Sequence, residues 1–393
     1  MKILWVKSDF LHPTTRGGQI RTLETLKRLH QRHEIHYVAF DLMDQPEGPA
    51  YASEYCTRAY PVLHRVPKKT SLAFVGQLAA GVFQSLPVAV SRYRSKAMKR
   101  QIQQILRVQK FDAIVCDFLF PAPNMPDLAT CVLFQHNVES TIWKRHVEHA
   151  AGFARRTYFQ LQARRMLAYE SQVCRAVKSV IAVSEADAGI MREQYGVQRV
   201  AAVPTGVDLE FFARPANPPR VADLVFLGSM DWMPNIDGMR WFVSEVLPLI
   251  RERRPECSLS IAGRKPAAEI LALAARDPGI QVTGTVPDVR PYLWGSAVSV
   301  VPLRIGGGTR LKIYEAMAAG IPVVSTTVGA EGLDIREGET IRIGDDPRTF
   351  ADACLELLDH PDQRARMAGN ALHMIEERYS WEVAARRFEE LLA

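Results

Sequence analysis

Short apolar runs alternate along this chain with longer stretches in which apolar residues recur every three or four positions. A short apolar run bounded by polar residues indicates a buried strand, whereas the longer repeat indicates an amphipathic helix. Strands that alternate with helices favour parallel sheets built from βα units. The pattern therefore predicts an α/β protein.

The expected strands form two sets on either side of a stretch with three prolines, residues 214–220. The first set comprises residues 2–6, 35–40, 113–116, 131–135, 179–183 and 200–203, and the second comprises 224–227, 258–262, 280–283, 297–301, 322–325 and 340–343. A chain of 393 residues is long enough for two domains of ordinary size. We expect an N-terminal domain at 1–205 and a C-terminal domain at 206–378, and we interpret 214–220 as the linker because proline discourages regular structure.

Composition and cysteine usage are those of an ordinary globular enzyme, with 47% hydrophobic and 23% charged residues. The six cysteines lie far apart and include no C-x-x-C pair, so neither a zinc site nor a disulfide framework is expected. The first apolar run ends at Lys7 and is too short for a secretory signal. These features predict a cytoplasmic protein.

Charge is distributed unevenly between the two halves. Residues 1–205 contain 28 Lys and Arg against 16 Asp and Glu, whereas the remainder contains 21 against 27. A basic half can face nucleic acid, an anionic membrane or an anionic acceptor, but no nucleic-acid-binding signature is present. We therefore rank a membrane surface or an anionic acceptor above nucleic acid.

Residues 71–91 carry no charge, although Pro87 and two glutamines argue against a membrane span. One interpretation is a buried helix. The other is an interfacial helix on the inner face of the membrane, assisted by the basic residues that follow it, Arg92, Arg94, Lys96, Lys99 and Arg100. Both interpretations remain open at this point.

The most informative stretch, residues 301–324, reads as a strand, a glycine loop, a helix and a second strand. Gly306, Gly307 and Gly308 have no Cβ to obstruct a ligand, and a helix capped near Thr309 directs its free N–H groups towards that loop. Full positive charge is added at this end of the helix by Arg310 and Lys312, which flank Leu311. The stretch predicts a phosphate-binding site.

Glu315 lies three residues beyond Lys312, so the two side chains share a helix face. They could form a surface ion pair that needs no ligand. Alternatively, Lys312 or Arg310 holds a diphosphate while the Glu315 carboxylate accepts two ribose hydroxyls. The adjacent glycine loop favours the second interpretation.

Three further candidates follow predicted strands, at the edge where an open α/β sheet binds ligands. These are the Gly17–Gly18 pair, His136 and Arg264. No two aspartates are separated by a single residue, so the D-x-D motif that binds a diphosphate through a metal ion is missing. We expect cationic side chains and helix N-termini to neutralise a diphosphate without a metal ion.

Together these motifs resemble glycosyltransferase family 4, a retaining family with the GT-B fold. The resemblance is carried by residues 182–187 with 203–208, by 224–228 through 263, and by 284–320. It implies two Rossmann-like doubly wound domains that face each other across a cleft. It also implies that a C-terminal helix at about 379–393 packs back onto the first domain.

The resemblance implies roles for individual residues. Glu315 matches the second acid of the E-x7-E motif, which binds the donor ribose, whereas Gly307 stands where the first acid belongs. The chain thus resembles the branch with a GGGTRLK loop, in which backbone amides replace that acid at the sugar. His136 and Gly17–Gly18 match first-domain contacts to sugar and phosphate, and Val286 lies where the nucleobase meets the backbone.

The resulting hypothesis is a retaining hexosyltransferase that uses a UDP- or GDP-sugar and requires no metal ion or other cofactor. Its acceptor is expected to be a lipid-linked or polysaccharide glycan, and His136, Arg310 and Lys312 are its expected catalytic residues. Two alternatives are a GT-B epimerase of sugar nucleotides and a degenerate module that binds the donor without catalysis. Gly307 weakens the first alternative, whereas the missing acid supports the second.

Overall fold

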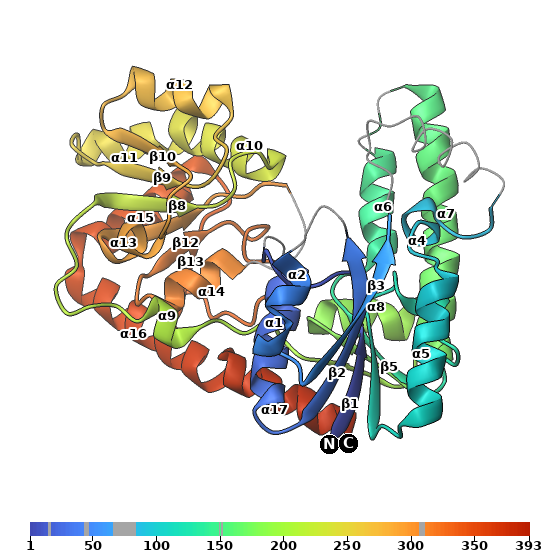
Figure 1. The fold of residues 1–393 in the computed structure, drawn as a ribbon. Helices are drawn as coiled ribbons and strands as arrows, with labels where there is room; N and C mark the ends of the chain where they lie inside the picture. Colours follow the sequence, from blue (N-terminus) through green and yellow to red (C-terminus); the bar gives the residue numbers. More distant parts are fainter. Residues whose placement is uncertain (15–16, 43–46, 66–83, 149, 151, 306–310) are drawn as a thin grey trace. The chain divides into compact units, whose positions relative to one another are not determined.

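The computed structural model describes residues 1–14, 17–42, 47–65, 84–148, 150, 152–305 and 311–393 (Figure 1). The chain divides into unit 1, Met1–Thr205 with Ala384–Ala393, and unit 2, Gly206–Val383. Residues 214–220 lie within unit 2, where Arg214 Nη2 donates to the Trp294 carbonyl over 2.9 Å. Their interpretation as the linker was therefore wrong, because the two units divide between Thr205 and Gly206.

Unit 1 contains a seven-stranded sheet in the order β3-β2-β1-β4-β5-β6-β7, and all neighbouring strands are parallel. Its strands are β1 Lys2–Val6, β2 Glu34–Leu42, β3 Arg58–His64, β4 Ala113–Asp117, β5 Cys131–Gln135, β6 Ser179–Ala182 and β7 Val200–Ala202. The strand order reverses at β1, so β1 and β4 leave a switch point where ligands bind in open α/β sheets.

Strand β3 was not expected from the sequence. Among the described residues it pairs only with β2, and it contains Pro61, which lacks a backbone donor. Val62 is buried but Leu63 is 67% exposed. An edge strand of this kind has too short an apolar pattern to be recognised by periodicity.

Helices of unit 1 cover both faces of its sheet (Figure 1). They are α1 Gly17–His30, α2 Glu47–Ala50, α4 Val88–Ser91, α5 Lys96–Val108, α6 Glu139–Glu148, α7 Phe153–Ala176 and α8 Glu185–Glu193. From Ala384 onward, the C-terminal helix α17, Trp381–Leu392, also belongs to unit 1. Within that unit Phe388 stacks on Trp5 of β1, with 5.4 Å between ring centroids.

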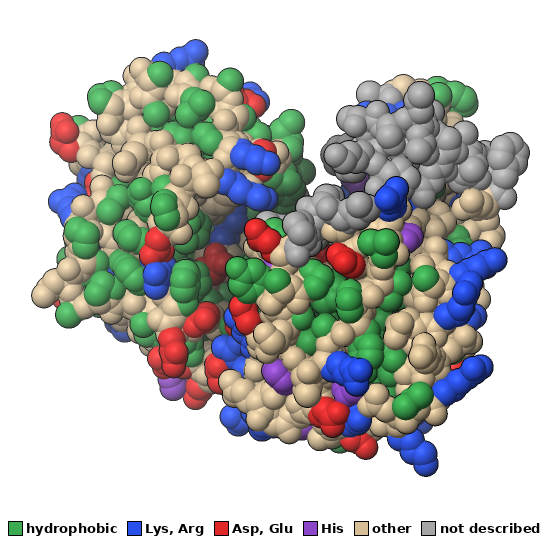
Figure 2. Space-filling view, viewed as in Figure 1, with side chains coloured by type: hydrophobic (Ala, Val, Ile, Leu, Met, Phe, Trp, Pro, Cys, Tyr) green, Lys and Arg blue, Asp and Glu red, His purple; other side chains and the backbone are tan. Residues whose placement is uncertain are grey.

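The uncharged segment lies largely outside the described residues, which resume at position 84. The helix α4 at its end buries Val90. Next in sequence, α5 buries Met98, Ile102 and Ile105 while its basic side chains remain exposed. Lys and Arg side chains gather along the edge of unit 1 that α5 forms (Figure 2). In the part of the chain that the structure describes, no helix is long and apolar enough to cross a membrane.

Unit 2 contains a six-stranded parallel sheet in the order β10-β9-β8-β11-β12-β13. Its strands are β8 Ala222–Leu227, β9 Leu259–Ala262, β10 Ile280–Gly284, β11 Ser296–Val301, β12 Val323–Ser325 and β13 Arg342–Ile343. The order reverses at β8, as it does at β1 in unit 1, so both units have doubly wound, Rossmann-like sheets. The α/β prediction is confirmed, and every expected strand has a counterpart whose ends differ by about two residues or fewer.

The helices of unit 2 are α9 Leu209–Phe212, α10 Met233–Trp241, α11 Leu247–Arg253, α12 Ala268–Arg276, α13 Arg290–Trp294, α14 Leu311–Ala318, α15 Pro347–Asp359 and α16 Pro361–Arg378, with a π-helical turn at Phe242–Val246. One apolar cluster packs α10, α11 and α15 against the sheet, and a second packs α13, α14 and α16. All six cysteines of the chain are free and buried.

The loops that follow β8 and β9 approach each other closely at the carboxyl end of the unit 2 sheet. A Cβ atom on Gly263 would lie 1.7 Å from the carbonyl oxygen of Gly228, which is backbone and cannot move aside. Any side chain at position 263 would therefore prevent this close approach of the two loops.

Gly263→Ala should lower the free energy of unfolding by about 2–3 kcal/mol, because the added methyl group forces the two loops apart. Gly369→Ala is the matched control: it lies in α16 with no atom within 4 Å of an added Cβ, and it should raise stability by about 0.5–1 kcal/mol. Urea unfolding followed by tryptophan fluorescence measures both changes. Equal midpoints for the two variants would contradict the steric argument.

Candidate functional site

Lys312, in the first turn of α14, reaches the carboxyl end of β8 in unit 2. Its Nζ atom donates to Asn235 Oδ1 over 2.8 Å and lies 4.4 Å from the centroid of the Phe226 ring. A Cβ atom on Gly228 would come within 2.8 Å of the same Nζ atom. The absence of a side chain at Gly228 thus lets an ammonium group lie over the strand end, at the point where the strand order reverses.

Asn235 connects Lys312 to the two neighbouring loops. It is buried in the first turn of α10, and its Nδ2 atom donates to the Ser229 carbonyl over 2.8 Å. The Ser229 hydroxyl in turn accepts from Arg264 Nε over 3.0 Å and donates to Asp231 over 2.6 Å. Arg264 is exposed at the end of β9, so the structure brings this predicted residue to the same edge as Lys312.

Glu315 lies one helical turn beyond Lys312 and is partly buried. Burial raises the pKa of its carboxyl group to about 7, and the charge of Lys312 opposes that shift. With the other described residues, the Glu315 carboxylate makes no hydrogen bond or ion pair. A simple surface ion pair does not describe these residues, because Lys312 donates to Asn235 while Glu315 keeps its acceptor oxygens available.

The remaining donor-loop predictions have different outcomes. Leu311 is the first residue of α14 and is partly buried. Residues 306–310 lie outside the described part of the chain, so the structure does not test the roles predicted for Gly306, Gly307, Gly308, Thr309 and Arg310.

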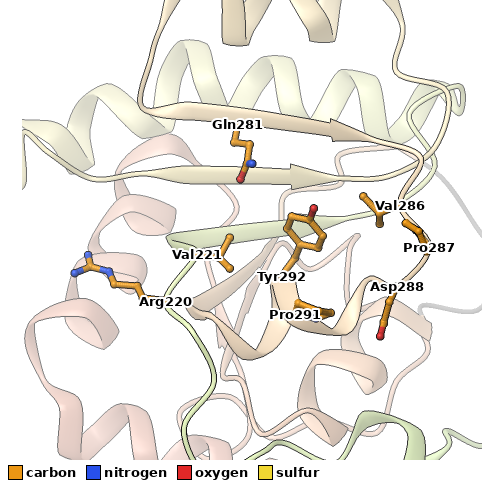
Figure 3. A pocket seen from close by; sticks show the side chains of 8 residues that line it. All are labelled: Arg220, Val221, Gln281, Val286, Pro287, Asp288, Pro291 and Tyr292. Atoms are coloured by element: carbon orange, nitrogen blue, oxygen red, sulfur yellow. The ribbon is translucent and has the colours of Figure 1, made fainter.

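Val286 lines a hollow of about 590 Å³ between β10 and α13 in unit 2 (Figure 3). The other lining residues are Arg220, Val221, Gln281, Pro287, Asp288, Pro291 and Tyr292. None of the residues around Lys312 lines this hollow. Val286 and the cationic residues of the predicted donor site therefore do not line the same hollow.

At the switch point of unit 1, a buried ion pair joins the ends of β1 and β4. Lys7 directly follows β1, and its Nζ atom lies 2.6 Å from Oδ1 of Asp117, the last residue of β4. Oδ2 of Asp117 accepts from Trp5 Nε1 over 2.8 Å and from the Thr22 hydroxyl over 2.7 Å. Burial alone would raise the pKa of Asp117, but Lys7 and His136 outweigh burial and hold it below its usual range.

His136 follows β5 and joins the same network. Its Nε2 atom lies 2.6 Å from Asp117 Oδ1, and its Nδ1 atom lies 3.0 Å from Arg21 Nη1. Burial is the main cause that lowers the pKa of His136, to about 4. A Cβ atom on Gly18 would lie 3.7 Å from the imidazole, so the structure brings these two predicted residues together. Gly17 is exposed at the start of α1.

Glu170 of α7 holds the chain on either side of His136. Its carboxylate accepts from Gln135 Nε2 over 2.7 Å and from the backbone amides of Glu139 and Ser140 over 2.9 and 2.8 Å. The amides are those of the first turn of α6, which a carboxylate stabilises. Burial and the neighbouring Glu170 raise the pKa of Glu139 to about 7.

Sequence reasoning found His136 but missed the residues that surround it. The strand-end rule could have identified Lys7 and Asp117, because each stands at the end of a predicted strand of the same sheet. No sequence signal identifies Arg21, Glu170 or Asn235, since these residues lie within helices and resemble ordinary polar helix positions.

A metal site is not apparent in the described residues, among which no three His, Cys, Asp or Glu side chains are grouped to hold an ion. Metal-independent activity stays a prediction, as do the catalytic roles of His136 and Lys312. The structure shows only that these two side chains lie at the switch points of their respective sheets.

Two family models match the chain. The model described as Glycosyltransferase Family 4 matches residues 15–211, and the model described as Glycosyl transferases group 1 matches residues 222–360. This chain belongs to glycosyltransferase family 4. The resemblance inferred from the motifs is thereby confirmed at the level of the family, and the protein is an enzyme that uses a nucleotide sugar.

Relatives of this glycosyltransferase include an uncharacterized 44.6 kDa protein in the cps region of Klebsiella pneumoniae, 21% identical over 96% of both chains. A second relative is D-inositol 3-phosphate glycosyltransferase 2 of Catenulispora acidiphila, which is 29% identical over 55% of this chain. The latter match spans only 56% of that relative's length.

The fold of the glycosyltransferase matches that of Anabaena Alr3699/HepE solved in complex with UDP. The TM-score is 0.70 at 13% identity, and the match covers 100% of this chain and 99% of the other. At this identity the likeness shows the fold alone. The class is α/β, and the fold is that of the GT-B glycosyltransferases.

Glu315→Gln should make the glycosyltransferase relatively more stable as the pH rises. Because burial raises the pKa of Glu315 to about 7, the folded wild type holds a proton that the unfolded chain releases near pH 4.3. The stability that the protonated Glu315 carboxyl group contributes to the wild type is therefore fully present below about pH 4.3. It is lost as the pH rises through about 7. Because the glutamine of Glu315→Gln does not titrate, the variant keeps its stability over this pH range.

Chemical unfolding of both proteins at pH 5 and pH 8.5 measures the effect. The stability difference in favour of the variant should grow by about 1–3 kcal/mol between these two pH values. A difference that stays constant with pH would show that Glu315 ionises normally in the folded protein.

Proposed function

We propose that this glycosyltransferase transfers a hexosyl group from a UDP- or GDP-sugar, with retention of anomeric configuration and without a metal ion. The acceptor we propose is a lipid-linked or polysaccharide glycan. The observation that carries this proposal is the pair formed by Lys312 and Glu315, a cation and an available carboxylate at the carboxyl end of the unit 2 sheet.

Lys312 supplies the charge that a departing diphosphate requires. The bond between the sugar C1 and the diphosphate oxygen breaks, a bond from C1 to the acceptor oxygen forms on the same face, and the acceptor's proton passes to the diphosphate. Negative charge develops on the leaving group, where a cation and helix N–H groups lower the barrier. Arg310 and the glycines at 306–308 extend this cationic, amide-rich site in the proposal.

Glu315 binds the donor ribose. Two vicinal hydroxyls can donate to the two oxygens of one carboxylate, and the Glu315 carboxylate has no competing partner among the described residues. Since the ionised form accepts both hydrogen bonds, a bound donor shifts Glu315 towards its ionised form.

The acceptor is proposed from the positive charge on the surface of unit 1. The exposed face of α5 carries Lys96, Lys99, Arg100 and Arg107 and no acid, which suits an anionic membrane surface or an anionic acceptor (Figure 2). The name of the Catenulispora relative includes an inositol phosphate, which is anionic but is not a glycan. The proposed location is therefore cytoplasmic, with peripheral association at the inner face of the membrane.

A transfer screen tests the function directly. The purified protein is incubated with radiolabelled UDP- and GDP-sugars and a membrane lipid extract, with and without EDTA. Labelled lipid that forms equally in EDTA is the expected result, and alkaline release of the glycan followed by NMR of the anomeric proton checks retention. An altered free sugar nucleotide would indicate an epimerase, and neither product would indicate a module that only binds the donor.

Donor binding should depend on Lys312 and Glu315. Calorimetry with UDP-glucose and GDP-mannose should show at least about tenfold weaker binding for Lys312→Met, since one charged hydrogen bond contributes about 1.5–3 kcal/mol. Glu315→Gln should weaken binding similarly and should lack the rise in affinity that we expect for the wild type as the pH increases through about 7. Sugar nucleotides are used because their diphosphate does not titrate near that pH.

The matched control is Lys178→Met, an exposed lysine of unit 1 that follows α7. It should bind the donor as the wild type does. Wild-type affinity in Lys312→Met would show that Lys312 does not contribute to donor binding.

A further inference from the structure

Both ring nitrogens of His136 are occupied by partners of fixed hydrogen-bonding character. The Arg21 guanidinium can only donate, so His136 Nδ1 accepts from it over 3.0 Å. The Asp117 carboxylate can only accept here, so His136 Nε2 carries a hydrogen and donates over 2.6 Å. These two contacts require a neutral imidazole with its hydrogen on Nε2.

Lys7 completes this arrangement from the end of β1. Its ammonium donates to Asp117 Oδ1 over 2.6 Å and to the Thr22 hydroxyl over 3.1 Å, and its 3.5 Å approach to His136 Nε2 places a full positive charge beside the ring. Lys7, Asp117 and His136 are 5%, 0% and 4% exposed, so water screens these charges little.

The charges around the ring disfavour its protonation. Two cations, Lys7 and Arg21, flank the imidazole, whereas one carboxylate, that of Asp117, contacts it. Asp187 of α8 interacts with Arg21. Burial, Lys7 and Arg21 lower the pKa of His136, and Asp117 only partly opposes them.

We propose that Lys7 and Asp117 are positioning residues for sugar transfer: Lys7 acts by keeping His136 neutral, and Asp117 acts by holding the ring hydrogen on Nε2. This inference rests on the proposed function. His136 does not exchange a proton with the substrate. Instead, its Nδ1 atom accepts from Arg21, whose Nε atom donates to Thr205 Oγ1 over 2.7 Å, and its ring lies beside Gly18 at the start of α1, 3.7 Å from the place that a Cβ atom would take.

Protonation of His136 at Nδ1 would break its hydrogen bond with Arg21. An Nδ1–H group would face the N–H groups of Arg21, so the hydrogen bond would be lost and two like charges would be buried 3.0 Å apart. Arg21 and the adjacent first turn of α1 would have to move. The Gly17–Gly18 amides, which we expect to contact the donor, would then lose their position.

The proposal is tested first on the state of the ring. The full-length protein is labelled with ¹⁵N-histidine, and the His136 signals are assigned by their absence in His136→Gln. Long-range ¹H–¹⁵N spectra should show a neutral Nε2–H tautomer from pH 8 down to about pH 5. An imidazolium or an Nδ1–H tautomer at neutral pH would overturn the proposal, whatever the activity.

Lys7→Met then removes the charge while it retains most of the side chain's volume. The His136 pKa should rise by about two and a half units or more, because one of the two flanking cations is gone and the Asp117 carboxylate is left to pair with the imidazolium. With the substrates identified in the transfer screen, kcat should fall at least threefold more at pH 6 than at pH 8.5, relative to wild type. A purely structural defect would lower kcat equally at both pH values and would contradict the proposal.

Asp117→Asn provides the second variant. An amide can still accept from His136 Nε2–H but does not neutralise Lys7, so we expect at least a tenfold loss of kcat at both pH values with the KM for the donor changed less than threefold. If this variant fails to fold, Lys7→Met decides the question alone. Wild-type kcat in a folded Asp117→Asn protein would overturn the proposal.

Lys2→Met is the matched control for Lys7→Met. Lys2 begins the same strand but forms a partly exposed ion pair with Glu34, at 3.1 Å. Its pH profile should coincide with that of wild type. If the wild type transfers no sugar at all, the proposed function fails, and the tautomer measurement alone then supports or overturns the proposed state of His136.

Discussion

The buried ion pair between Lys7 and Asp117 is the interaction on which the polar end of unit 1 depends. Two charges 2.6 Å apart and almost without solvent contact are tolerated only if other groups satisfy their remaining hydrogen-bonding capacity. Trp5, Thr22 and His136 do this for Asp117. Loss of one member of such a pair leaves an uncompensated buried charge, which typically costs about 3–5 kcal/mol. The pair therefore fixes the ends of β1, β4 and β5 relative to one another.

Unit 2 repeats the topology but uses its lysine differently. Lys312 also lies at the switch point of a parallel sheet, where its contacts include a neutral amide, that of Asn235, and the aromatic ring of Phe226. The same fold carries a lysine paired with a buried carboxylate in unit 1 and, in the proposed function, a lysine that binds the diphosphate in unit 2.

The environment of His136 shows why position alone does not define a residue's chemistry. A histidine at a strand end indicates a ligand contact, and histidine is the side chain best suited to proton transfer near neutral pH. In this enzyme burial and two cations hold its pKa near 4, and both of its nitrogens are committed to protein partners. The imidazole is consequently a rigid neutral support between Asp117 and Arg21.

The sequence by itself determined the α/β class, twelve of the thirteen strands that the structure describes and the family, because periodicity and motif spacing are properties of neighbouring residues. It also singled out Lys312, Glu315 and His136 as candidate site residues. It did not reveal β3, whose pairing with β2 compensates for a weak apolar pattern. Only the tertiary structure decided the electrostatics of the sites, since Lys7 contacts Asp117 across 110 positions and Lys312 contacts Asn235 across 77. Burial and charge depend on such distant neighbours, and therefore the pKa of each side chain follows from the fold.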